Sequence, residues 1–271
     1  MHDLDAYLAR IGLRGDPDIA RVHRAHATSI PFENLDPQRG VAVSLAPQDI
    51  ERKLVAERRG GYCFEHNLLL RDALEALGAR VQLLLARVRL GSPPGSVRPR
   101  SHLVLRVEDG GDAWHADVGF GRGTLLEPLP FGPGDEHEQA GWRFRIVEDG
   151  AELVLQTIIE DDWTDVYAFQ LGPTPAIDVE VCNWWTSTHP HSPFVTSFIV
   201  AAQADDGTRT ALSDWESLGA RDGGFALTEQ TPTGTTASRV SSAEVGELLA
   251  GRFALPGFAV DGSGRLTTRE G

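Results

Sequence analysis

Residues 58–90 read RRGGYCFEHNLLLRDALEALGARVQLLLARVRL, and the hydrophobic period changes once within this stretch. Before Gly78 the apolar residues Leu70, Leu74 and Leu77 recur at helical spacing, and Gly78 is a typical helix stop. After Gly78 the run VQLLLARVRL has the composition of a strand. The chain therefore changes from helices to strands near residue 80, which predicts an α+β fold.

Three further helices are expected upstream of this stretch. An apolar stripe from Leu4 to Ile11 predicts the first helix, Asp16-Pro17 opens the second by a cap and a first-turn proline, and the third runs from Pro47 to Arg58. The segment IPFENLD (30–36) is expected to be a non-helical connection between the second and third helices.

Short β-rich runs separated by turn clusters dominate the middle of the chain and predict an antiparallel barrel or sandwich. These runs are SHLVLRVE (101–108), AWHADVGF (113–120), WRFRIV (142–147) and AELVLQTI (151–158). The acidic run IIEDDWTD (158–165) is interpreted as a solvated turn. Beyond it the pattern mixes, with a helix in 177–190, a strand in 194–203 and a closing helix in 241–253 that has a Ser241/Glu244 capping box.

The composition limits the possible functions. The chain has 271 residues, a net charge of -14 and two cysteines far apart in sequence. The charge argues against a nucleic-acid partner, and two distant cysteines form neither a disulfide framework nor a closed zinc site. The sequence contains no secretory start and no run of membrane-spanning length, so we expect a cytoplasmic protein with no membrane partner.

Cys63 is the first candidate for chemistry. It follows a glycine pair and begins a helix, where the helix dipole favours a thiolate. The alternative is a small buried hydrophobic residue with no chemical role. An imidazole with its own orienting carboxylate would decide in favour of a nucleophile.

The hairpin SHLVLRVEDGGDAWHADVGF (101–120) supplies such a pair. If the turn is centred on Gly110-Gly111, Asp109 pairs with Asp112, and one face of the hairpin becomes continuously apolar. His102 and Asp117 then lie on the other face as diagonal neighbours, about 7–8 Å apart at the backbone. The alternative is that this polar face meets solvent, as in many half-buried hairpins.

Other polar residues have structural explanations. His189 and His191 flank a proline and are interpreted as loop residues, so no metal site is expected. Glu65 and His66 are interpreted as polar residues of the helix's first turn, and Cys182 as a buried residue on an apolar helix face.

Five segments together resemble the arylamine N-acetyltransferases. They are IPFENLD, RGGYCFEHN, SHLVLRV, DVGFG and NWWTSTHPHSPF, in that order along the chain. The resemblance implies a helical domain (1–85), an antiparallel β-barrel domain (86–190) and a C-terminal α/β lid (191–271), with a core like that of cysteine proteases. It also implies acetylation of an arylamine or hydrazine by a ping-pong mechanism. Acetyl-CoA would be the acyl-donor substrate, and no permanently bound cofactor is expected.

The resemblance assigns roles to individual residues. Cys63 matches the nucleophile, His102 the base and Asp117 the orienting carboxylate. Arg59 is expected to be structural and to pair with Glu33 or Asp36.

Residues around these positions are expected to contact the substrates. Phe32, Gly119, Phe120 and Gly121 are candidate substrate-binding residues, because glycines permit close approach of a ligand and the resemblance places Phe32 at the acceptor pocket. The candidates for contacting CoA are Arg98, Arg100 and Arg122.

Three alternatives remain open at this point. An amide synthase of the same superfamily, closing a polyketide macrolactam, would have the same three residues. A cysteine hydrolase of protease or transglutaminase type would be acylated by a peptide or glutaminyl substrate. A non-catalytic ligand-binding protein that keeps the fold is the third. The sequence also leaves open the physiological amine, the acyl-chain preference and the oligomeric state.

Overall fold

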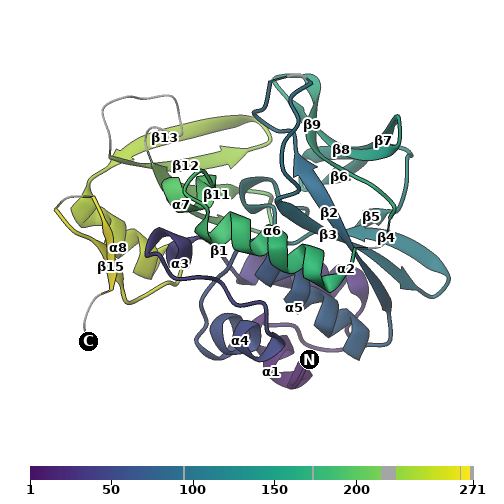
Figure 1. The fold of residues 1–271 in the computed structure, drawn as a ribbon, viewed down its shortest axis with the longest axis horizontal. Helices are drawn as coiled ribbons and strands as arrows, with labels where there is room; N and C mark the ends of the chain where they lie inside the picture. Colours follow the sequence, from purple (N-terminus) through teal and green to yellow (C-terminus); the bar gives the residue numbers. More distant parts are fainter. Residues whose placement is uncertain (94, 173, 215–223, 263, 269–271) are drawn as a thin grey trace.

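The computed structural model describes residues 1–93, 95–172, 174–214, 224–262 and 264–268. The strands form an eight-stranded sheet and a five-stranded sheet. In Figure 1 these two sheets lie on opposite sides of the molecule, with α1 (Leu4–Arg10), α4 (Pro47–Ile50) and α5 (Cys63–Ala76) below them. The predicted α+β class is confirmed, and the larger sheet forms a nearly closed antiparallel barrel. No helix among the described residues is long and apolar enough to cross a membrane.

The first part of the chain is helical, as the period of its apolar residues predicts. It contains α1 (Leu4–Arg10), α2 (Ile19–Ser29), α3 (Leu35–Gln38), α4 (Pro47–Ile50), the π-helix η1 (Glu51–Ala56) and α5 (Cys63–Ala76). The predicted start of the second helix is wrong, because the side chain of Asp18, not Asp16, caps it by accepting a hydrogen bond from the Arg21 N–H.

The predicted third helix begins at Pro47 as expected but continues as η1 and ends at Ala56 instead of Arg58. Arg58 has a φ of 54°, a left-handed conformation that no helix continues through. The segment 30–36 also differs from the prediction, because Phe32–Glu33 form the strand β1 and α3 begins at Leu35.

The eight-stranded sheet has the order β5-β4-β3-β2-β9-β8-β7-β6. Its strands are β2 (Arg80–Val88), β3 (His102–Asp109), β4 (Asp112–Ala116), β5 (Leu129–Pro130), β6 (His137–Gln139), β7 (Trp142–Asp149), β8 (Glu152–Ile159) and β9 (Asp162–Phe169). The short helix η2 (Gly121–Gly123) follows β4. The interpretation of 158–165 as a turn is wrong, because only Glu160 and Asp161 turn the chain, and β9 begins at Asp162.

The five-stranded sheet has the order β1-β10-β11-β12-β13, so a strand from the N-terminal part forms its edge. The remaining strands are β10 (Ile199–Gln203), β11 (Arg209–Asp214), β12 (Phe225–Thr231) and β13 (Gly234–Val240). The other elements are α6 (Ala176–Thr188), α7 (Pro193–Thr196), α8 (Ser242–Gly251), β14 (Phe258–Val260) and β15 (Leu266–Thr268). The capping box at Ser241 and Glu244 is confirmed, although two strands follow this helix.

Alternate residues of β3 belong to two different cores. Leu103, Leu105 and Val107 pack with α5 and the other N-terminal helices, whereas Val104 packs inside the barrel. This alternation is the two-residue period of a strand that is buried on both faces. The expected boundary at residue 85 falls within β2, because this strand spans both cores.

Candidate active site

Cys63 is the first residue of α5, and its side chain is buried, with 2% exposed. Its Sγ lies 3.6 Å from the carbonyl oxygen of Ser101, the residue before β3. Gly60 and Gly61, which precede Cys63, pack so closely against neighbouring residues that neither position has room for a side chain. A Cβ at Gly60 would lie 2.0 Å from the Pro31 carbonyl oxygen, and one at Gly61 would lie 2.7 Å from the Glu65 carboxylate.

The hairpin β3–β4 brings His102 and Asp117 together. Its register pairs Asp109 with Asp112 and Leu105 with Ala116, as the sequence predicted. Strand β4 ends at Ala116, and Asp117 follows with its Oδ2 at 2.7 Å from the Nε2 of His102. Both side chains are buried, so the alternative of a solvent-facing hairpin is wrong.

Each member of this pair stabilises the charged form of the other. Burial opposes protonation of His102, but the charge of Asp117, its hydrogen bond and the contact with Cys63 together raise the pKa of His102 to about 10. Burial also opposes ionisation of Asp117, but His102, Asn67 and the Gly119 N–H hold its pKa below the usual range. Since Nε2 of His102 is occupied by Asp117, its Nδ1 is left for Cys63.

Asn67 orients Asp117 and was missed by the sequence analysis. Its Nδ2 donates to Asp117 Oδ1 at 2.9 Å and to the Leu103 carbonyl at 2.6 Å, and its Oδ1 accepts from the Val118 N–H at 3.1 Å. Asn67 lies four residues after Cys63, so both side chains share one face of α5. This spacing was a signal that was available in the sequence.

His23 of helix α2 holds the backbone of Asp117. Its Nε2 accepts a hydrogen bond from the Asp117 N–H at 3.2 Å, so Nδ1 carries the proton and donates to the Leu126 carbonyl at 3.1 Å. Burial lowers the pKa of His23 to about 4, which keeps the ring neutral at pH 7. The contact spans distant parts of the chain, and no local sequence pattern points to it.

Tyr167 extends this network from β9. Its hydroxyl lies 2.8 Å from the Nε2 of the buried His115, and its ring centroid lies 4.9 Å from that of His102. Burial, together with the nearby charge of Asp117, raises the pKa of Tyr167 well above its ordinary value. Tyr167 was not predicted as a site residue because strand β9, which carries it, was not predicted.

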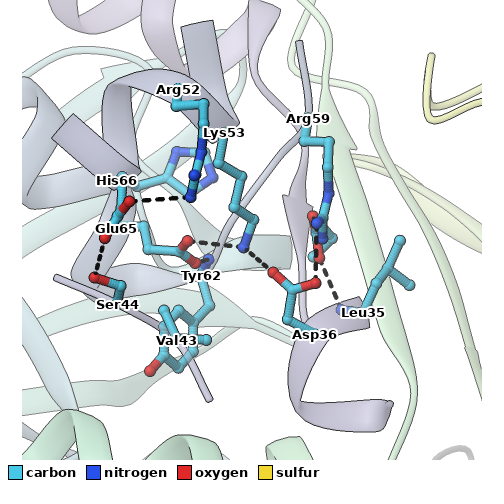
Figure 2. A network of polar contacts seen from close by, with 12 residues as sticks. Leu35, Asp36, Val43, Ser44, Arg52, Lys53, Arg59, Tyr62, Glu65 and His66 are labelled. Atoms are coloured by element: carbon cyan, nitrogen blue, oxygen red, sulfur yellow. Dashed lines mark hydrogen bonds and ion pairs between the residues drawn. The ribbon is translucent and has the colours of Figure 1, made fainter. Parts of the chain in front are cut away.

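A buried network of charges anchors the chain before Cys63 (Figure 2). Arg59 contacts Glu33 at 2.8 Å and Asp36 at 2.9 Å, which are the acceptors that the sequence predicted. Lys53, the single lysine of the chain, lies between Asp36 at 2.8 Å and Glu65 at 2.7 Å. The other oxygen of Glu65 accepts from the Tyr62 N–H at 3.1 Å. Glu65 is therefore a buried ion-pair partner as well as a first-turn residue of α5.

The candidate substrate-binding residues lie around these side chains. The Phe32 ring is 7% exposed and stacks on His66 with centroids 6.3 Å apart, and a Cβ at Gly121 would lie 3.3 Å from this ring. Phe120 packs edge-on against His102, with ring centroids 5.1 Å apart. The space beside Gly119 is filled by the protein, because a Cβ there would lie 2.7 Å from Cys63 Cα.

The remaining candidates lie farther from the pair. Arg98 and Arg100 are exposed in the segment before β3, whereas Arg122 is half-buried in η2. His189 and His191 pack against each other at the end of α6, with ring centroids 5.4 Å apart. Cys182 is half-buried on α6, so the expected burial is only partial, and burial raises the pKa of its thiol.

The chain is similar in sequence to known proteins over most of its length. A family model described as N-acetyltransferase matches residues 17–256. The arylamine N-acetyltransferase of Mycobacterium tuberculosis is 37% identical over 98% of this chain and 94% of the relative. That of Mycolicibacterium smegmatis is 40% identical over 75% of this chain and 78% of the relative.

Solved structures give the same result for the fold. The structure of Mycobacterium marinum arylamine N-acetyltransferase in complex with CoA superposes with a TM-score of 0.85 at 36% identity, covering 93% of each chain. The arylamine N-acetyltransferase from Salmonella typhimurium has a TM-score of 0.83 at 30% identity, covering 93% of this chain and 90% of that one.

Proposed function

The chain belongs to the arylamine N-acetyltransferase family, and we propose that it transfers the acetyl group of acetyl-CoA to arylamines and hydrazines through an acetyl-cysteine at Cys63. Support comes from relatives that are arylamine N-acetyltransferases and match almost the whole chain. The M. marinum relative was solved with CoA, which supports a CoA thioester as the acyl donor here.

The observation that carries the proposal is the short, buried contact between His102 and Asp117 beside Cys63. A protonated His102 next to the thiol stabilises a thiolate, and Asp117 stabilises the imidazolium and fixes its ring. The location of Cys63 at the first residue of α5 adds the favourable end of the helix dipole. The three residues thus have the arrangement that an activated cysteine nucleophile requires.

In the first half-reaction the Cys63 thiolate attacks the thioester carbonyl of acetyl-CoA. The tetrahedral intermediate collapses, the C–S bond to CoA breaks, and His102 gives its proton to the departing CoA sulfur. The product is acetyl-Cys63 with a neutral His102. We propose that the Cys63 backbone N–H is one donor to the oxyanion, because it lies at the N-terminus of α5.

In the second half-reaction the amine attacks the acetyl-cysteine carbonyl. His102 takes a proton from the attacking nitrogen, the C–S bond to Cys63 breaks, and the thiolate–imidazolium pair is restored. Arylamines suit this step because their low basicity leaves them unprotonated at neutral pH. We propose that Phe32, Phe120 and Gly121 form the wall on which the aromatic acceptor lies.

The proposal is tested by intact-protein mass spectrometry after mixing with acetyl-CoA, with and without aniline. We expect an acetyl adduct that is absent in Cys63→Ala and disappears from the parent protein when aniline is added. Cys182 is the matched control, because Cys182→Ala should acquire and lose the adduct as the parent does.

Other outcomes point to other activities. No adduct in a folded protein with a reduced Cys63, combined with acylation by a longer carrier-bound thioester, would indicate an amide synthase. Release of peptide fragments or ammonia from other substrates would indicate a cysteine hydrolase. Ligand binding retained in Cys63→Ala, with no turnover in the parent, would indicate a binding protein.

A further inference from the structure

Arg209 on β11 is a buried cation with no carboxylate counterion among the described residues. Its side chain is among the buried polar groups, with 5% exposed, and its Nε has no hydrogen-bond partner among the described residues. No described carboxylate forms an ion pair with its guanidinium. Arg59, by contrast, has two carboxylates. Burying an unpaired charge is costly, so Arg209 needs a partner that the described part of the chain does not supply.

Two aromatic rings of the barrel hold the guanidinium in place. Its central carbon lies 3.6 Å from the centroid of Trp142 and 5.9 Å from that of Phe144, both on β7. Trp142 is itself fixed, because its Nε1–H donates to the Gly207 carbonyl at 2.7 Å. Cation–π stacking covers one side of the guanidinium and leaves its N–H groups, which lie in the plane, unpaired.

Arg209 lines a cavity of about 440 Å³ to which the barrel and the five-stranded sheet both contribute. Arg122 of η2 lines the same cavity and has no ion pair among the described residues. Burial lowers the pKa of both arginines, as is expected for cations taken out of water. The lining also includes the hydroxyls or amides of Thr157, Thr228 and Gln230.

The cavity adjoins the candidate active site through one side chain. Phe120 lines the cavity and packs edge-on against the His102 ring, with centroids 5.1 Å apart. Phe120 therefore connects the cavity to the His102–Asp117 pair. A cavity in this position suits a part of a substrate that does not itself react.

We propose that this cavity binds an oxyanion, a phosphate or a carboxylate, carried by a small molecule that reacts at Cys63, with Arg209 and Arg122 as its donors. The planar guanidinium of Arg209 matches a two-oxygen acceptor, and such charge-assisted pairs are among the stronger hydrogen bonds. The bound anion would compensate the buried charge of Arg209, for which the described residues provide no carboxylate. That the molecule reacts at Cys63 rests on the proposed function, but the binding of the anion does not.

The oxyanion has two possible sources. The phosphates of the acyl donor are one, and a carboxylate on the aromatic ring of the acceptor is the other. Both groups offer negatively charged oxygens to the arginines, so the experiment has to distinguish the two sources.

The first experiment measures binding of pyrophosphate and of benzoate to the whole protein by isothermal titration calorimetry. We expect at least one probe to bind the parent and to bind Arg209→Met about tenfold more weakly or worse, because the variant loses a charge-assisted hydrogen bond. Met keeps an apolar stem against Trp142 and removes the cation. Neither probe binding the parent, or equal binding by the variant, would overturn the proposal.

Arg145→Met is the matched control for a purely structural role. Arg145 also stacks on a tryptophan, with its central carbon 4.1 Å from the Trp163 centroid, but it is bonded to Gln156 and lies outside the cavity lining. We expect this variant to bind the probes as the parent does. If Arg209→Met does not fold, Arg122→Met replaces it, with the same expected loss of binding and the same outcome overturning the proposal.

The second experiment identifies the source by steady-state kinetics with paired substrates. Acetyl-CoA is compared with S-acetyl-N-acetylcysteamine, a donor without phosphates, and 4-aminobenzoate is compared with aniline. If Arg209→Met raises KM for acetyl-CoA alone, the phosphates are the ligand, and if it raises KM for 4-aminobenzoate alone, the carboxylate is. If KM changes for none of the four, the cavity serves neither substrate and this part of the proposal is wrong. An inactive parent with intact probe binding would instead contradict only the proposed function.

Discussion

At the scale of single residues, Gly119 lies where the chain that follows the β3–β4 hairpin contacts the start of helix α5. A Cβ at this position would lie 2.7 Å from Cys63 Cα and 3.0 Å from both the Cys63 carbonyl oxygen and the Asn67 Nδ2. Because two of these neighbours are backbone atoms, a side chain has to displace the start of α5 or the hairpin. Because Gly119 has no side chain, the hairpin can pack directly against the start of α5.

We expect Gly119→Ala to lower the free energy of unfolding by about 1–3 kcal/mol, the usual cost of overpacking. Cys63 acetylation should slow at the same time, because the thiol moves relative to His102. Thermal unfolding and the rate of adduct formation measure the two effects. Gly134→Ala is the control, since nothing lies within 4 Å of a Cβ there. Equal stabilities of the two variants would contradict the packing argument.

Lys53 is expected to be structural. It is buried between Asp36 and Glu65, and its removal leaves the buried Glu65 without its cation and Asp36 with Arg59 alone. We expect Lys53→Met to destabilise the protein by about 3–5 kcal/mol, as for other broken buried pairs. Chemical denaturation measures this, and the neighbouring exposed Arg52→Met should change stability by less than about 1 kcal/mol.

Arg59 is expected to act in the same network. Arg59→Gln should lower the unfolding temperature, because Glu33 and Asp36 lose a shared partner. A variant with an unchanged unfolding temperature and no acetylation would contradict the structural role and indicate a direct part in the chemistry.

The sequence predicted Cys63, His102 and Asp117 as one candidate site because two local patterns were strong. A glycine pair before a helical period located the thiol, and the apolar face of one hairpin selected the register of the other two. His23 and Lys53 could not be assigned in this way, because their partners lie on other elements and only the fold brings them together.

At the scale of elements, Asn34 joins the N-terminal part of the chain to the five-stranded sheet. Its Nδ2 donates to the carbonyls of Phe194 at 2.9 Å and Ser197 at 2.7 Å, and its Oδ1 accepts from the Ile199 N–H at 2.9 Å. Asn34 is completely buried, so none of these groups would find water if the side chain were removed.

We expect Asn34→Ala to cost about 2–4 kcal/mol, since it leaves buried backbone groups unpaired. Hydrogen exchange should become faster in β1 and β10 and remain unchanged in the barrel strands β7 and β8. Gln38→Ala, which removes a single bond to the Phe194 carbonyl, is the milder control. Uniform acceleration in all strands would indicate global destabilisation and would contradict a local joint.

The predicted elements were most accurate where one period extends over many residues. Helix α5 begins at Cys63 as expected, and the hairpin β3–β4 has the expected register. Strand β9 was missed because Asp162 and Asp165 conceal its apolar residues, and β1 was missed because two residues carry no period. Both strands are defined by pairing with distant partners, which no local pattern encodes.

At the scale of the whole molecule, buried histidines make stability depend on pH. Burial lowers the pKa of His23, His66 and His115 to about 4, and that of His26 falls well below its ordinary value. In the unfolded chain these rings titrate near about 6.5, so below that pH the unfolded state binds more protons. Stability is therefore complete above about pH 6.5 and is lost as the pH falls toward 4.

His102 acts in the opposite direction. Its pKa is raised to about 10 in the fold, so its contribution is complete below about pH 6.5 and is lost as the pH rises toward 10. We expect the unfolding temperature, measured by differential scanning calorimetry from pH 4.5 to 10, to be highest near neutrality. His189→Gln should leave the decrease of the unfolding temperature at acid pH unchanged, because His189 is only half-buried and is not one of the four buried histidines. A flat profile between pH 6.5 and 4.5 would contradict the role of the buried rings.

The pairing of β1 with β10 also concerns the order in which the chain is made. Phe32 of β1 pairs with Ala201 of β10. During synthesis β1 therefore has no partner until β10, which leaves the ribosome much later, is available. A parallel bridge between Phe32 and Gly61 connects β1 to the residues just before Cys63. A nascent chain that already contains Cys63, His102 and Asp117 thus still lacks the strand that fixes the approach to Cys63. We expect an arrested nascent chain ending before β10 to react poorly with acetyl-CoA, so that the thiol becomes an efficient nucleophile only late in translation.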